Sequence, residues 1–335
     1  MVLTKLKALI IGYAPKDRNY AGAMKKINAA HSLIKTNKTL DAAKKLGIKE
    51  RTQKIFNKKE LNQILKIILA TGFDNVVKTS KNFDWVFKRK VKSSDSIKQA
   101  KTKSIILKGI KKMKASNDPA HDFSHIMRCL RFSEFMLNNT RLELDWGVLV
   151  TAIVWHDIAR VDNQGILYQK RFRWFRKTPV IRDLSLFGIY IRDAYESVLI
   201  VHKEFKKEKL DKKFIKSVSH AIYGSDNKFL FYDKYAFKKK YQRFIADLDN
   251  LDMVTIARWE DLNRNVLDKK ICDKHFLNRV ALLNFIFNVR RVERKLNYNI
   301  SKQLIQVIKE STLLHFEEFY KTDLKFIIKA LNKSK

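Results

Sequence analysis

Glycine and proline are scarce in this chain, with 9 glycines and 3 prolines among 335 residues. A fold built from β-sheet needs many turns, and these two residues are concentrated in turns. Their scarcity favours long helices, so the composition predicts an all-α protein. Hydrophobic residues make up 45% of the chain, which is enough to bury a substantial core and excludes disorder as the general state of the chain.

Cysteines and long apolar runs are also nearly missing. The two cysteines, Cys129 and Cys272, are too few for a disulfide framework, so reduced thiols and a cytoplasmic location are expected. The apolar run at residues 8–12 is too short for the core of a signal peptide. No later run reaches the roughly 18 residues that a membrane helix needs. The sequence therefore predicts a protein without a membrane span.

Acidic residues are outnumbered two to one, with 34 Asp and Glu against 70 Lys and Arg, a formal net charge of +36. The excess is uneven, because residues 1–115 hold 29 basic and 7 acidic residues and the rest of the chain holds 41 and 27. Such a charge attracts polyanions, namely nucleic acid, nucleotides or an anionic membrane. A basic N-terminal region that binds nucleic acid is one interpretation. A general excess of lysine on an ordinary surface is the other.

Residues 37–56 have the pattern of a helix-turn-helix. Ala43 supplies the small residue at the helix crossing, Gly47 the turn and Ile48 the buried plug. However, Gln53 stands where an apolar residue is usual. A plain helical hairpin that ends in a glycine cap accounts for the same residues.

Four side chains on three expected helices carry the chemistry of the chain. His125 lies early in a helix that extends to about residue 138. His156 and Asp157 end a strongly apolar stretch, and Asp249 belongs to a later helix. Two imidazoles and two carboxylates from separate helices can converge on one divalent cation. This mixture of nitrogen and oxygen ligands suits a metal ion that assists hydrolysis.

The words around these residues, HDFSHIMR, VWHDIAR and IADLDNLD, resemble the HD-domain superfamily of metal-dependent phosphohydrolases in their order and context. The family pattern is a histidine, a His-Asp pair and a distant aspartate on an all-helical fold. The resemblance implies an HD-domain-like helical bundle with extra helices at both ends. The expected parts are a basic helical N-terminal region at 1–115, an HD-type core at 116–260 and a helical C-terminal extension at 261–335.

The resemblance also implies a site and a reaction. By position, His125, His156, Asp157 and Asp249 match the metal ligands of the family, with Asp247 or Asp252 as alternatives to Asp249. The bound ion would be Mn²⁺, Mg²⁺, Fe²⁺, Co²⁺ or Zn²⁺, which the ligand types do not separate. The implied substrate is a nucleotide or related phosphoester, hydrolysed by a water molecule that the metal activates.

Four further residues are catalytic candidates. Asp122 lies one turn before His125 and would orient it or act as acid or base; a plain first-turn carboxylate is the alternative. Arg128 and Arg160 would bind a substrate phosphate, or else form salt bridges. His220 matches part of a region where relatives carry additional histidines. A His-Ser pair common a few residues later in the family is absent, so the resemblance leaves one metal ion or two, and an altered substrate pocket, as open alternatives.

Residues 166–179 interleave cations with aromatic residues, which suits a loop that contacts phosphates and bases. An amphipathic segment that packs its aromatics on the protein is the alternative. The alternative to an enzyme is a nucleic-acid-binding protein, or a module that senses a nucleotide, with a vestigial HD site.

Overall fold

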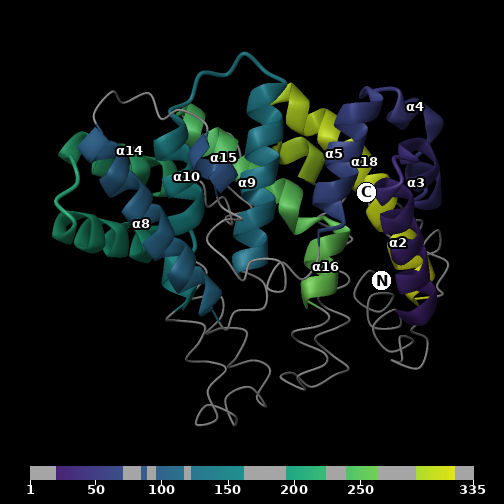
Figure 1. Ribbon diagram of the computed structural model, residues 1–335, viewed down its shortest axis with the longest axis horizontal. Helices are drawn as coiled ribbons and strands as arrows, with labels where there is room; N and C mark the ends of the chain where they lie inside the picture. The colour runs from purple at the N-terminus through teal and green to yellow at the C-terminus, as the bar shows by residue number, and fades with distance from the viewer. Residues whose placement is uncertain are drawn as a thin grey trace, which may run out of the picture. The chain divides into compact units, whose positions relative to one another are not determined.

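The chain is helical throughout the part that the computed structural model describes, which is residues 20–70, 84–88, 96–116, 122–161, 194–223, 239–262 and 292–320 (Figure 1). No strand occurs in these ranges. The all-α fold expected from the scarcity of glycine and proline is therefore confirmed. The helices are α2 (Tyr20–Lys35), α3 (Thr39–Lys45), α4 (Glu50–Gln53), α5 (Lys58–Ile68), α7 (Asp84–Lys88), α8 (Ser96–Lys114), α9 (Phe123–Asn138), α10 (Trp146–Trp155), α14 (Lys212–Tyr223), α15 (Lys240–Met253), α16 (Ile256–Leu262) and α18 (Asn299–Tyr320).

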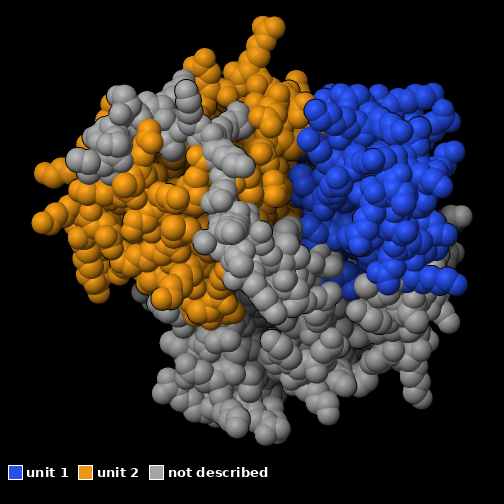
Figure 2. Space-filling model, in the orientation of Figure 1, with its two compact units in different colours: residues 1–70, 253–294, 302–335 blue, residues 71–252, 295–301 orange. Residues whose placement is uncertain are grey.

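The chain divides into two compact units, coloured separately in Figure 2. Unit 1 combines residues 1–70 with 253–294 and 302–335, and unit 2 combines residues 71–252 with 295–301. The units therefore do not follow the expected boundaries at 115, from the charge distribution, and at 260, from the resemblance, because unit 2 begins at residue 71 and unit 1 resumes at residue 253. The reason is packing: α8 of the basic region lies against α10 in unit 2.

In unit 1, the segment with the helix-turn-helix pattern forms two helices of very different length. Gly47 has a left-handed φ of +73°, and a Cβ atom there would lie 2.7 Å from the side chain of Leu314, so this turn requires glycine. Ile48 is buried, as the pattern predicts. The buried side chain of Gln53 donates a hydrogen bond to the Ile48 carbonyl at 2.6 Å, which explains a polar residue at this place. The second helix, α4, is only one turn long, so the segment has the form of a short helical hairpin.

In unit 2, the apolar helix α10 is central. All ten of its residues are buried, and it packs against α8, α9 and α14. A helix that is hydrophobic on every side is stable only in the interior. Asp145 caps its first turn by accepting a hydrogen bond from the Val148 amide at 3.0 Å. The other end of α10 therefore places His156 and Asp157 inside the protein.

Several expectations lie outside the described residues. They concern the aromatic and basic segment at 166–179, Cys272, residues 1–19 and most of the C-terminal extension. Within the described helices, none combines the length and the apolar character needed to span a membrane.

Candidate metal centre

Helix α9 brings His125 into the interior of unit 2. The Asp122 carboxylate caps this helix by accepting a hydrogen bond from the His125 backbone amide at 3.1 Å. A carboxylate in this place satisfies a free amide of the first turn and interacts favourably with the helix dipole. Of the two roles considered for Asp122, its position thus matches the first-turn carboxylate. The imidazole of His125 follows in that turn and is fully buried.

His156 is held by the end of α10. Its Nδ1 donates to the Ile153 carbonyl at 2.7 Å, so Nε2 is the ring nitrogen left for other partners. The Nε2 atom lies 3.1 Å from Oδ2 of Asp157, and Nε2 of His125 lies 3.5 Å from the same oxygen. The turn at residues 156 and 157, directly after α10, thus brings two adjacent side chains close to His125.

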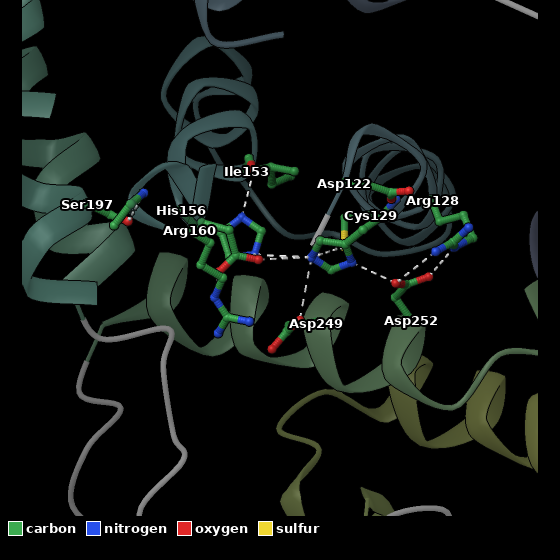
Figure 3. Close-up of polar contacts among 12 residues, drawn as sticks. Asp122, Arg128, Cys129, Ile153, His156, Arg160, Ser197, Asp249 and Asp252 are labelled. Atoms are coloured by element: carbon green, nitrogen blue, oxygen red, sulfur yellow. Dashed lines mark hydrogen bonds and ion pairs between the residues drawn. The ribbon is translucent and has the colours of Figure 1, made fainter. Parts of the chain in front are cut away.

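Three of the four predicted ligands form a compact group of donor atoms, and the fourth, Asp249, approaches this group at His125 (Figure 3). The Nε2 atoms of His125 and His156 are 3.3 Å apart, and Oδ1 of Asp249, from α15, lies 3.6 Å from His125 Nε2. Donor atoms of His125, His156 and Asp157 all lie within 4.8 Å of one another. Ligands about 2.0–2.2 Å from one ion lie roughly 3.3–3.6 Å from each other in tetrahedral coordination and roughly 2.8–3.1 Å apart at adjacent octahedral positions. The observed spacings fit donors that share a single cation.

The cluster opens to solvent at Asp249. The side chain of Asp249 is 36% exposed, whereas those of His125, His156 and Asp157 are at most 7% exposed. Asp249 is therefore the most exposed of the four predicted ligands.

Asp252 has a part that the sequence did not assign to it. One of its oxygens lies 2.6 Å from Nδ1 of His125, and the other accepts a hydrogen bond from Nε of Arg128. All three side chains are fully buried. Asp252 thus orients the His125 ring instead of joining the cluster of donors. The signal in the sequence was the three-residue spacing from Asp249, which places both carboxylates on one face of α15.

The two arginine candidates differ in their surroundings. Arg128 is held by Asp252 in the interior, a placement that favours a buried ion pair over a contact with a substrate phosphate. Nε of Arg160 lies 3.3 Å from Oδ1 of Asp157, so its positive charge stands directly beside the cluster.

His220 and Asp247 have contacts elsewhere. His220 is exposed on α14, where its Nδ1 accepts a hydrogen bond from Lys239 at 2.9 Å. Partial burial, and then the charges of Lys239 and Lys216, lower the pKa of its imidazole. Asp247 is buried and accepts hydrogen bonds from the backbone amides of Asn297 and the following residue. The described contacts of His220 and Asp247 do not include the four converging side chains.

The field of the carboxylates controls the protonation of His156. Burial by itself lowers the pKa of this imidazole, but Asp157 and Asp249 outweigh burial and raise it to about 9. At neutral pH and without a metal ion, both ring nitrogens of His156 are thus protonated and the imidazole is positively charged. The cluster holds positive charge in either state, as a proton or as a metal ion.

We expect metal binding at pH 7.5 to release about one proton, because His156 must lose its proton to become a ligand. The apparent affinity should rise about tenfold per pH unit as pH increases and level off near the His156 pKa. Calorimetric titration with Mn²⁺ in buffers of different ionisation enthalpy measures the proton directly. A His220→Gln variant, changed on the surface, should behave like wild type. An affinity that does not change between pH 6.5 and 8.5 would contradict the prediction.

Comparison with known proteins gave no match: no protein-family model, no curated protein and no solved structure matches this chain.

Proposed function

We propose that this protein is a metal-dependent phosphohydrolase in which His125, His156, Asp157 and Asp249 hold a divalent cation. The observation that carries the proposal is the spacing of their donor atoms, because Nε2 of His125 lies 3.3–3.6 Å from donor atoms of the other three residues, which come from other parts of the chain. Buried histidines and a buried carboxylate are costly unless they are paired or bind a cation. The order of the motifs, which resembles the HD-domain superfamily, supports the same assignment.

The charge of the cluster supports an anionic substrate. With neutral imidazoles, two carboxylates and the neighbouring Arg160 give a formal charge of −1, which a divalent cation changes to +1. The chain as a whole carries +36, and its field favours the approach of anions. A nucleotide or a related phosphoester is the substrate class that fits these charges.

Each residue around the proposed metal site would have its own role in hydrolysis. When bound, a divalent cation would supply Lewis-acid charge and lower the pKa of a bound water molecule toward about 7. The Ile153 carbonyl fixes the ring of His156, and Asp252 fixes that of His125, so both Nε2 atoms keep their direction. Asp249 lies at the exposed edge, where a substrate would enter. Arg160 adds a positive charge beside Asp157 that stabilises negative charge on a phosphoryl group.

Metal content and hydrolysis, measured together, test the proposal. The wild-type protein, treated with a chelator and then with Mn²⁺, should bind about one ion and hydrolyse a phosphoester from a panel of nucleotides and a generic substrate. Both properties should be absent from His156→Ala/Asp157→Ala, because half of the ligand set is gone. A His202→Ala variant, which removes a histidine outside the cluster, should retain both.

Two results would decide against hydrolysis. A folded wild-type protein that neither binds metal nor turns over any substrate would leave the basic surface as the basis of function. Metal binding and nucleotide-induced stabilisation, without product, would identify a nucleotide-sensing module instead.

A further inference from the structure

Exposed cations of unit 1 gather between the end of α3 and the start of α5. The only acidic residue from 44 to 59 is Glu50, whose carboxylate pairs with Lys54 at 2.9 Å. None of the remaining six cations forms an ion pair with a described residue. The basic surface defined in this way consists of Lys44, Lys45, Lys49, Arg51, Lys58 and Lys59, all exposed.

The lysine-rich helix α8 in unit 2 provides a contrast. Lys108 pairs with Glu204 at 2.9 Å and with Glu208 at 2.8 Å, and Lys114 lies over the ring of Phe123. There, cations have partners within the fold. The six cations of the basic surface form no ion pair with a residue that the structure describes, and their mutual repulsion disfavours the compact state. A partner of opposite charge would remove that repulsion.

Apolar groups accompany the basic surface. Leu40 and Ile55 are 48% and 38% exposed, although both are large hydrophobic residues. Lys45 also lines a small hollow, with room for about one water molecule, together with Leu46 and Leu314. A fitting partner offers apolar faces as well as negative charge.

Nucleic acid supplies closely spaced phosphates for the six cations. This charge decides the choice of partner, because Leu40 and Ile55 are aliphatic and do not stack on bases as aromatic side chains do. An anionic membrane fits less well, since a surface that inserts into lipid uses exposed Trp, Phe and Leu side chains together. The aromatic residue of this segment, Phe56, is only 8% exposed.

We infer that the basic surface binds nucleic acid through the phosphate backbone without reading the base sequence. Sequence is read in the major groove by a helix that reaches the base edges. Helix α4 has four residues, so it is only about 6 Å long. Its start is occupied by Glu310, which accepts hydrogen bonds from the Lys49 amide at 2.8 Å and the Thr52 hydroxyl at 3.0 Å. This binding does not depend on the proposed phosphohydrolase activity.

Fluorescence anisotropy with labelled single-stranded and double-stranded oligonucleotides, over a series of salt concentrations, tests the inference. Wild type should bind with steep salt dependence and without preference for base order. In Lys44→Gln/Lys45→Gln/Lys49→Gln, the slope of log affinity against log salt should fall by about 2 to 3, close to one per phosphate contact removed. The matched control is Lys206→Gln/Lys212→Gln/Lys213→Gln, which removes the same charge from exposed positions in unit 2. Its slope should equal that of wild type.

Four outcomes would overturn the inference. Equal loss in the two triple variants would show an effect of net charge alone. If the wild-type protein does not bind oligonucleotides at low salt, nucleic acid is not the partner of the basic surface. Tighter binding to phosphatidylserine vesicles than to oligonucleotides, lost in the Lys44→Gln/Lys45→Gln/Lys49→Gln variant, would assign the surface to membranes. Affinity that changes strongly with base order would contradict backbone recognition. Circular dichroism checks that each variant is folded.

Discussion

Replacing Asp252 with alanine is expected to weaken metal binding by about 10- to 100-fold and to lower the free energy of unfolding by about 3–5 kcal/mol. The first effect arises because Asp252 orients the His125 ring through a contact of 2.6 Å. The second arises because the guanidinium of Arg128, fully buried, would lose its carboxylate partner. Calorimetric titration with Mn²⁺ and denaturant unfolding of the metal-free protein measure the two effects separately.

An Arg128→Met variant distinguishes orientation of His125 from general stability. It leaves Asp252 as a buried carboxylate without the guanidinium, so the metal-free protein should again be less stable. The contact between Asp252 and His125 remains, and metal affinity should therefore fall less than in Asp252→Ala. Equal losses of metal affinity in two variants of equal stability would show that Asp252 acts only through the fold.

Replacing Gly109 with alanine should destabilise the protein by about 1–3 kcal/mol, through overpacking between α8 and α10. An added Cβ atom would lie 2.5 Å from Nε1 of Trp155 and 2.6 Å from Cγ1 of Val154. Both side chains are fully buried, and the Trp155 ring is also fixed by its hydrogen bond to the Ile105 carbonyl. Because Trp155 precedes His156 in the chain, metal affinity should fall as well.

The sign of the Gly109→Ala effect is informative. In an exposed helix, the same change stabilises by about 0.5–1 kcal/mol, since alanine loses less backbone entropy than glycine. The control Ser104→Ala, at an exposed position of α8, should be neutral or slightly stabilising. If Gly109→Ala raises the free energy of unfolding in a denaturant titration, α8 does not pack as closely against Trp155 and Val154 of α10 as described above.

Most of the correct predictions came from patterns of residues that are close together in the sequence. The continuous apolar stretch before His156 predicted a buried helix, and α10 is buried along its whole length. The sequence motifs around His125, His156 and Asp157 pointed to three side chains whose donor atoms lie within 4.8 Å of one another, and Asp249 lies 3.6 Å from His125. Each of these predictions depends on residues close together in the chain.

The remaining features depend on contacts between distant segments. Asp247, Asp249 and Asp252 are alike in sequence, and only the packing of α15 against its neighbours gives them different partners. Arg128 has the spacing of a phosphate ligand, but a carboxylate 124 residues later holds it in the interior. The two compact units also join segments far apart in the chain, which composition along the sequence does not reveal.

The interleaved order of the two units has a consequence for synthesis on the ribosome. Residues 1–70 are made first, yet the other segments of unit 1 begin only at residue 253. At a translation rate of 5–20 residues per second, roughly 10 to 40 seconds pass between the synthesis of residue 70 and that of residue 253. During that interval, apolar side chains of α2, α3 and α5 lack part of their native cover, so a nascent chain stalled before residue 253 should recruit chaperones.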